Sequence, residues 1–307
     1  MTSPVVDVAG LVMRYRDKLA VDGLSLTVEV GSITAILGPN GAGKTTTLET
    51  CEGYRRPQSG SVRVLGLNPI AEHRELAPRL GVMLQSGGAW SAVRAGEMLR
   101  YVASLHAHPL PLDTLVQRLG LESCGRTPYR RLSGGQQQRL GIAMAVVGRP
   151  ELVFLDEPTA GLDPQARHAA WELVAELARD GVTVVLTTHY MEEAEQLATQ
   201  IHVIDHGRLL VSGSPQELTT AGAHNTIRFR AIRGLDTSAL IAALPADCSV
   251  QESAPGAYRV DGDVTPHTLA TVASWCANQG VLPDGLAVEK TTLEDVFLEL
   301  TGRELRS

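Results

Sequence analysis

Short apolar runs alternate with amphipathic segments along most of the chain. Three of the runs are apolar on both faces, which is typical of parallel strands buried within a sheet. These runs are Ile33–Leu37, Leu152–Leu155 and Val182–Leu186. Segments with helical spacing follow them, namely Lys44–Cys51, Gln165–Ala178 and Met191–Gln200. This order predicts an α/β fold with a mainly parallel sheet flanked by helices.

The segments around this core have other patterns. Alternating residues separated by turn signals predict an antiparallel β subdomain near the N-terminus. Its expected strands include Val5–Val8, Leu24–Val28 and Ser61–Leu65. Farther along, the helical spacing of Glu97–Leu105 and Leu112–Leu119 predicts a helical insertion, and Asp205-His206-Gly207 predicts a hairpin between two short apolar runs.

After residue 220 the sequence predicts a second, smaller domain. Residues 221–225 are mostly small and indicate a linker. The expected elements are strand, helix, strand, strand, helix, strand and a final helix: Thr226–Ala231, Thr237–Leu244, Cys248–Glu252, Tyr258–Asp261, Pro266–Gln279, Leu286–Glu289 and Leu293–Thr301. The first six have the order of a ferredoxin-like fold. We therefore expect a large domain at 1–220, with a helical subdomain at about 88–145, and a small α+β domain at 226–307.

A glycine-rich segment follows the first buried run and opens the first predicted helix. It fits the pattern G-x-x-x-x-G-K-[ST] of a P-loop, which binds phosphate. The segment consists of Gly38, Pro39, Asn40, Gly41, Ala42, Gly43, Lys44, Thr45 and Thr46. Its glycines allow several backbone N–H groups to point at one anion, and the helix N-terminus adds further free N–H groups. Lys44 can then neutralise charge on the β- and γ-phosphates, and the Thr45 hydroxyl can coordinate Mg²⁺.

The other two buried runs also end in polar residues. Asp156 and Glu157 follow the second run, and His189 follows the third. Because ligands of open α/β sheets bind beyond the carboxyl ends of the strands, we expect these side chains to meet at one site. There Asp156 would hold Mg²⁺, Glu157 would polarise an attacking water and His189 would contact the γ-phosphate. Without the P-loop, helix capping by the acids and a structural histidine would be the simpler interpretations.

Leu132-Ser133-Gly134-Gly135-Gln136 precedes another helical pattern. A serine and two glycines at the start of a helix form a second candidate anion site. In isolation the same residues are equally well explained as a serine N-cap with flexible glycines. The chemistry of the pentapeptide alone does not decide between these interpretations.

Together, these motifs resemble those of the ATP-binding subunits of ABC transporters. Residues 132–136 are similar to the signature motif of that family, Gln85 to its Q-loop glutamine and Gly161–Asp163 to its D-loop. Tyr15 stands where the family places an aromatic ring that stacks on adenine, although a tyrosine there can also simply pack on the sheet. All motifs occur in the order of the family, and the resemblance covers roughly Val5 to Leu218.

The resemblance implies a head-to-tail homodimer with two ATP molecules between the subunits. Each ATP would lie on Tyr15 and the P-loop of one chain and would be closed by Ser133 and Gly135 of the other. The implied set of nucleotide-binding residues further includes Gly134, Gln136 and Asp163. The implied catalytic residues are Glu157, His189, Gln85 and Lys44, and the implied Mg²⁺ ligands are Thr45, Gln85 and Asp156. The helical insertion would dock on an integral membrane permease.

The C-terminal segment narrows the resemblance further. Residues 293–302, Leu-Glu-Asp-Val-Phe-Leu-Glu-Leu-Thr-Gly, are similar to the ending of the daunorubicin-resistance type of ATPase, which energises export of drugs, antibiotics, lipids or glycans. The same residues also have the spacing of an amphipathic packing helix. The chain departs from the family at residues 87–93, which lack the usual Leu-Thr-Val sequence. The docking surface for the permease is therefore not identified, and neither is the substrate. An importer ATPase remains an alternative to the exporter.

Charge and composition mainly indicate which kind of partner the chain binds. The chain has 27 Lys and Arg against 34 Asp and Glu, so its net charge of −7 argues against a nucleic-acid partner. A soluble ABC ATPase of ribosomes or DNA is disfavoured further, because the chain has one cassette and no heptad insertion. No run approaches the roughly 18 apolar residues of a membrane span, and the N-terminus lacks a signal-peptide pattern. We therefore expect a cytoplasmic protein, bound peripherally at the inner face of the membrane.

Overall fold

The structure is a computed structural model of the chain, and it describes residues 3–85, 90–221, 226–262, 264–289 and 292–301. The chain divides into two compact units, of which the first runs to Pro215 and the second begins at Gln216. Each unit has a hydrophobic core of its own. Residues 222–225 of the predicted linker, and 87–89 of the segment that departs from the family, lie outside the described residues.

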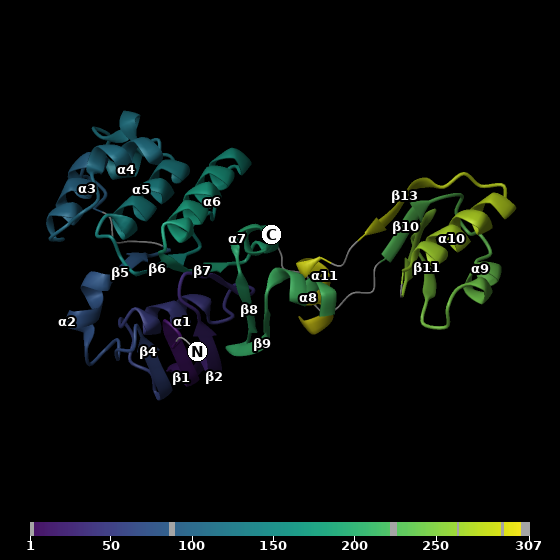
Figure 1. Ribbon diagram of the computed structural model, residues 1–307, viewed down its shortest axis with the longest axis horizontal. Helices are drawn as coiled ribbons and strands as arrows, with labels where there is room; N and C mark the ends of the chain where they lie inside the picture. The colour runs from purple at the N-terminus through teal and green to yellow at the C-terminus, as the bar shows by residue number, and fades with distance from the viewer. Residues whose placement is uncertain (1–2, 86–89, 222–225, 263, 290–291, 302–307) are drawn as a thin grey trace. The chain divides into compact units, whose positions relative to one another are not determined.

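A six-stranded sheet forms the centre of the first unit, in the order β5-β6-β7-β3-β8-β9 (Figure 1). Its strands are β5 (Leu80–Met83), β6 (Leu152–Asp156), β7 (Thr183–Thr188), β3 (Ile33–Leu37), β8 (Gln200–Asp205) and β9 (Arg208–Gly213). All neighbours pair in parallel except β8 and β9, which form the predicted antiparallel hairpin. Every residue of β3, β6 and β7 is buried, as the apolar runs predict.

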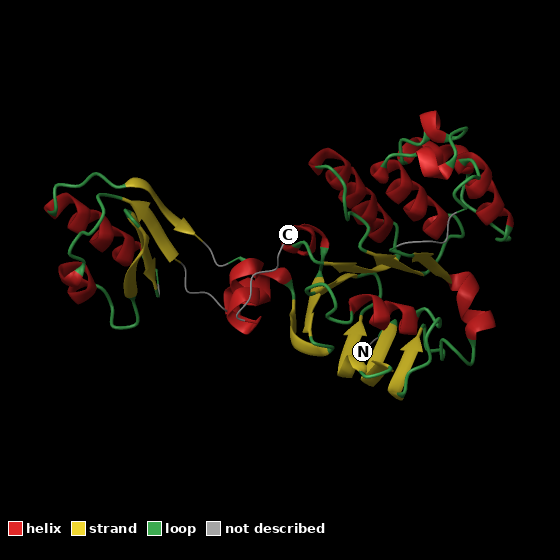
Figure 2. Ribbon diagram, turned by 180° about the vertical axis from the view of Figure 1, so that it is seen from behind, coloured by secondary structure: helices red, strands yellow, loops and turns green. Residues whose placement is uncertain are grey.

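Helices cover both faces of this sheet. Figure 2 shows α5 (Gly134–Val146) and α6 (Pro164–Arg179) on one side, and α1 (Lys44–Cys51) between the large sheet and a smaller one. The helix predicted at Met191–Gln200 is too long: α7 ends at Leu197. Gln200 instead opens β8, where it pairs with Thr34 of β3. Backbone pairing with a buried strand therefore ends the helical pattern three residues early.

The smaller sheet is the predicted antiparallel β subdomain, in the order β2-β1-β4. Its strands are β1 (Val6–Tyr15), β2 (Lys18–Val28) and β4 (Ser59–Val64). The first two are longer than predicted, because bulges shift the register between them and interrupt the alternation that marks a strand. The extension pairs Tyr15 with Lys18 across the tip of the hairpin.

The helical insertion contains α3 (Ala95–Ser104) and α4 (Leu112–Arg118), and α5 packs against α3. Three elements before it were not predicted: the one-turn helix α2 (His73–Leu76), the 3-10 helix that follows it (Ala77–Arg79) and β5. Strand β5 has only four residues and includes Gly81, which weakens its strand pattern. The glycine is needed because a Cβ there would lie 2.2 Å from the carbonyl oxygen of Ala145 in α5.

The second unit contains a four-stranded antiparallel sheet in the order β11-β12-β10-β13. The strands are β10 (Thr226–Arg230), β11 (Ser249–Ala254), β12 (Ala257–Asp261) and β13 (Asp284–Glu289). With α9 (Ser238–Ala243) and α10 (Pro266–Asn278), they follow the predicted ferredoxin-like order. In its core, the aromatic ring of Phe229 contacts those of Tyr258 and Trp275. Helices α8 (Pro215–Ala221) and α11 (Leu293–Thr301) flank the sheet domain in sequence.

Candidate active site

The turn between β3 and α1 leaves room only for glycine at two positions. A Cβ on Gly38 would lie 2.3 Å from the carbonyl oxygen of Ile204 in β8. Gly43 has a φ of 105° in the left-handed region, and a Cβ there would lie 2.5 Å from the carbonyl oxygen of Ala20. The P-loop is therefore held between β2 and β8, and α1 begins at Lys44 directly beyond it.

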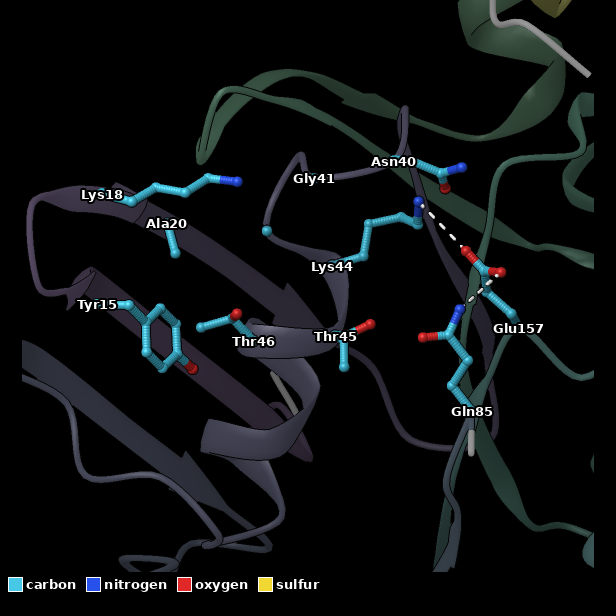
Figure 3. A pocket seen from close by; sticks show the side chains of 11 residues that line it. Tyr15, Lys18, Ala20, Asn40, Gly41, Lys44, Thr45, Thr46, Gln85 and Glu157 are labelled. Atoms are coloured by element: carbon cyan, nitrogen blue, oxygen red, sulfur yellow. Dashed lines mark hydrogen bonds and ion pairs between the residues drawn. The ribbon is translucent and has the colours of Figure 1, made fainter. Parts of the chain in front are cut away.

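A pocket of about 420 Å³ opens on this turn (Figure 3). Its lining combines the hairpin tip of the small sheet, the P-loop and the residues that follow β5 and β6. The lining residues are Tyr15, Lys18, Ala20, Asn40, Gly41, Gly43, Lys44, Thr45, Thr46, Gln85 and Glu157. Of these, Lys18 and Ala20 were missed from the sequence, where the only available signal was their place in the strand that pairs with Tyr15.

Lys44 is the cation at the base of the pocket, and its side chain is 5% exposed. Its Nζ donates hydrogen bonds to the carbonyl oxygens of Gly38 at 2.8 Å and Pro39 at 3.2 Å. It also lies 3.6 Å from Oε1 of Glu157. Burial lowers the pKa of Lys44, while the nearby carboxylates of Glu157 and Asp156 act in the opposite direction.

Three polar side chains converge on Glu157. Besides the Lys44 ion pair, Gln85 Nε2 donates a hydrogen bond to Oε2 at 3.0 Å, and His189 Nδ1 lies 3.3 Å from Oε1. Figure 3 shows Lys44 and Gln85 pointing at this carboxylate from different elements. The backbone of Glu157 has a φ of 49°, an uncommon conformation for a residue with a side chain, and its N–H donates to Thr187 in β7. The strand ends therefore meet, as the position of the motifs predicts.

Asp156 and Thr45 provide oxygen atoms close to Lys44. The buried Asp156 carboxylate accepts hydrogen bonds from the hydroxyls of Thr187 and Thr45. Burial raises its pKa, and these two hydrogen bonds oppose the rise. A carboxylate, a hydroxyl and the amide oxygen of Gln85 are hard donors, so this residue set fits Mg²⁺.

The signature and D-loop residues lie apart from this pocket within one chain. Ser133 and Gln136 form a capping box at the start of α5: the Ser133 hydroxyl accepts from Gln136 N at 3.3 Å, and Ser133 N donates to Gln136 Oε1 at 2.9 Å. Asp163 caps α6 in the same way, accepting from Ala166 N at 2.9 Å. Neither these residues nor Gly135 line the P-loop pocket, so a single chain does not bring them together with Lys44.

Tyr15 lines the pocket and is exposed, with 37% of its surface accessible to solvent. The Arg55 guanidinium lies 5.2 Å from the centre of its ring, and a bidentate contact with Glu49 anchors that guanidinium. The ring therefore has a cation against it and also lines the pocket.

Comparison with known proteins agrees with this geometry. The ABC transporter family matches residues 21–160. Over the full length of the chain, 34% of residues are identical to the daunorubicin resistance ATP-binding protein DrrA3 of Streptomyces coeruleorubidus, of which 98% is covered. The chain belongs to the ATP-binding proteins of ABC transporters. It is an ABC-type ATPase.

Other relatives of this ABC ATPase give the same result. The Nod factor export ATP-binding protein I of Ralstonia nicotianae is 36% identical over 99% of the chain and 96% of its own length. Among solved structures, cbiO1 of Clostridium perfringens, part of the ABC transporter complex cbiONQ, superposes with a TM-score of 0.62 at 28% identity. That match covers 71% of this chain and 92% of cbiO1. Within the described ranges of the ABC ATPase, no helix has the length and apolar character needed to cross a membrane.

Proposed function

We propose that this ABC ATPase energises an exporter of drugs, antibiotics, lipids or glycans through a separate membrane permease. The hydrolytic part rests on one observation: Glu157 lies at the end of β6 with Lys44, Gln85 and His189 all within 3.6 Å of its carboxylate oxygens. Export is inferred from the relatives, two of which are named for daunorubicin resistance and Nod factor export. An importer finds no comparable support.

In the proposed reaction, Tyr15 stacks on adenine and the P-loop N–H groups bind the phosphates. The Lys44 ammonium leaves the carbonyl oxygens of Gly38 and Pro39 and binds phosphate oxygens instead. Bound Mg²⁺, held by Thr45 and Asp156 with Gln85 beside it, would neutralise charge on the phosphates. Glu157 accepts a proton from water, and the water oxygen bonds to the γ-phosphorus. The bond to the bridging oxygen breaks, and its electron pair leaves with ADP.

The proposed assembly is a head-to-tail homodimer. Because Ser133, Gly135 and Asp163 lie apart from the P-loop pocket of their own chain, they are free to close the pocket of a second copy. Gly134 and Gln136 belong to the same surface. We further propose that the ATPase domain spans 1–220 and the small domain 226–307. The helical subdomain, at about 88–145, would dock on the permease at the cytoplasmic face of the membrane, with no nucleic acid involved.

Co-purification tests this function. A tagged Glu157→Gln chain is isolated from solubilised membranes of the native host with Mg-ATP present, and Lys44→Ala serves as the matched control. Blocking proton transfer is expected to lower turnover by at least about 100-fold and to retain ATP. We expect a stoichiometric polytopic membrane protein with Glu157→Gln, and less of it with Lys44→Ala. Ribosomal or DNA-repair proteins without a membrane protein would contradict the proposal, as would rapid turnover by Glu157→Gln.

A further inference from the structure

Glu193 is a buried acid in α7 (Met191–Leu197), the helix that follows His189. Its side chain is 0% exposed. One carboxyl oxygen, Oε1, accepts hydrogen bonds from Thr159 Oγ1 at 2.8 Å and from Trp171 Nε1 at 3.1 Å. These donors come from different segments, since Thr159 lies in the loop after β6 and Trp171 in α6. One side chain therefore joins three segments behind the active site.

Two of those segments carry residues of the proposed catalytic site. Thr159 is two residues after Glu157, and its hydroxyl is itself buried. The Thr188 hydroxyl also acts on the Glu193 carboxyl, and Thr188 immediately precedes His189. Glu193 thus interacts with side chains that lie close in sequence to both members of the Glu157–His189 pair, whose Oε1 and Nδ1 atoms are 3.3 Å apart.

A second line of contacts leads from Glu193 to the His189 ring. The ring centre of His189 lies 4.1 Å from that of Tyr190. The Arg167 guanidinium lies 4.3 Å from the Tyr190 ring centre, and its charge also acts on the Glu193 carboxyl. Glu193 therefore interacts with Thr188, the residue before His189, and is linked to the His189 ring through Arg167 and Tyr190.

Stability alone does not account for an acid at this position. Removing a carboxyl group from water is costly unless its oxygens are fully hydrogen-bonded. In the described part of the chain, Oε2 of Glu193 has no hydrogen-bond partner, and burial raises the pKa of the group. A methionine of similar volume would fill the space at lower cost. The hydrogen bonds of Oε1 are what the acid supplies and methionine cannot.

We propose that Glu193 is a positioning residue that fixes His189 relative to Glu157, because its hydrogen bonds anchor α7 to the Thr159 loop and to α6. It does not line the P-loop pocket, and it acts through the hydrogen bonds from Thr159 and Trp171. This role rests on the proposed catalytic functions of Glu157 and His189. Loss of the hydrogen bonds should misplace the pair by a fraction of an ångström, which impairs the chemical step while the P-loop still binds ATP normally.

The test uses steady-state ATP hydrolysis and ATP binding by the full-length chain. Glu193→Met should lower kcat about tenfold with less than a twofold change in ATP affinity. Glu193→Gln retains an acceptor oxygen and should stay within threefold of the wild type. Thr159→Val removes one donor with little change in volume and should lower kcat, whereas Thr159→Ser should not. The Thr159 pair decides the matter if Glu193→Met fails to fold, as judged by circular dichroism.

Combination with His189→Ala separates this inference from the proposed function. In that background, Thr159→Val should reduce kcat less than twofold further, because the residue it positions has been removed. An equal reduction in both backgrounds, or a folded Glu193→Met with unchanged kcat, would overturn the positioning role alone. Full turnover by His189→Ala by itself would instead remove the proposed catalytic role of the histidine, and with it the reason to position it.

Discussion

At the scale of single residues, the active site depends on placing opposite charges close together where little of either side chain is exposed to solvent. Lys44 is held by two backbone carbonyls and one carboxylate, so its cationic form is compensated although burial lowers its pKa. The same low exposure strengthens the attraction between this ammonium and any anion that enters, because the effective dielectric constant falls away from bulk water. The buried lysine is therefore suited to phosphate.

We predict that Lys44→Ala lowers affinity for Mg-ATP on the order of 100-fold, which corresponds to loss of one close charge contact at intermediate dielectric. Lys18 offers a matched control, because it lines the same pocket but is exposed. Lys18→Ala should lower affinity less than about fivefold, since water screens its charge. Isothermal titration calorimetry on both variants measures the difference. Equal losses would show that burial does not set the contribution of the cation.

A second buried acid gives a prediction about pH. Glu52, at the end of α1, is 2% exposed, and burial together with the charges of Asp156 and Glu49 raises its pKa to about 8. Between its ordinary value of 4.5 and about 8, the folded chain keeps a proton that the unfolded chain has lost. The free energy of unfolding should therefore fall as pH rises through this window, by up to about 1.4 kcal/mol per pH unit, and level off above it.

Glu52→Gln removes that titration and should flatten this part of the profile. Urea denaturation of the metal-free chain at several pH values between 5 and 9 measures the effect. The variant should gain stability relative to the wild type as the pH increases. Parallel profiles would contradict the assignment, because every other titrating group is common to the two chains.

The sequence predicts residues with a local motif better than residues placed by tertiary contacts. Lys44, Glu157 and His189 each follow a buried apolar run, so their convergence follows from the geometry of a parallel sheet. Glu193 has no such signal, since Glu192 and Glu195 in the same helix are equally acidic. Only the packing of α6 against α7 buries one of the three and pairs it with Thr159.

At the scale of elements, the P-loop shows how close packing selects glycine. Gly43 and Gly66 both have φ in the left-handed region, at 105° and 79°. A Cβ on Gly66 would meet no atom within 4 Å, whereas one on Gly43 would lie 2.5 Å from the carbonyl oxygen of Ala20. Alanine at either position would pay for the left-handed backbone, roughly 1 kcal/mol or more. Only at Gly43 would its Cβ also clash with Ala20.

We therefore predict that Gly43→Ala lowers stability by more than Gly66→Ala does, and that it also weakens ATP binding at least tenfold by moving α1 away from β2. Thermal unfolding and nucleotide titration on the two variants test this. Similar losses of stability would mean that the left-handed backbone, and not the contact with Ala20, makes glycine necessary in the loop.

Element boundaries depart from prediction where pairing overrides local pattern. The central strands are recognisable because apolar residues occupy both faces and every position is buried, whereas β5 is four residues long and contains a glycine required by α5. Bulges in β1 break the alternation that a two-residue period requires, so only part of the strand is predicted. In each case the missing information is a contact with a distant segment.

At the scale of the whole molecule, the P-loop pocket and the second unit are formed by different parts of the chain. All residues that line the P-loop pocket lie between Tyr15 and Glu157, within the first unit. The second unit has its own sheet and aromatic core, so its alternating strands could be predicted independently of the motifs. The proposed signature surface also belongs to the first unit but stands outside its pocket, which leaves the completion of the site to a second copy of the chain.

That proposal makes a prediction about ATP-dependent dimers. A Glu157→Gln chain with Mg-ATP should elute as a dimer in size-exclusion chromatography with light scattering, and Ser133→Arg added to it should give monomers that still bind ATP. Ser133→Arg also removes a helix cap, which costs about 1 kcal/mol of stability. This effect has to be distinguished from loss of the contact between the subunits. Thr265→Arg controls for it, because Thr265 forms an equivalent capping box in α10 of the second unit and should leave the dimer intact. If Ser133→Arg also dimerises, the signature serine does not close the site of the partner subunit, and the head-to-tail arrangement is wrong.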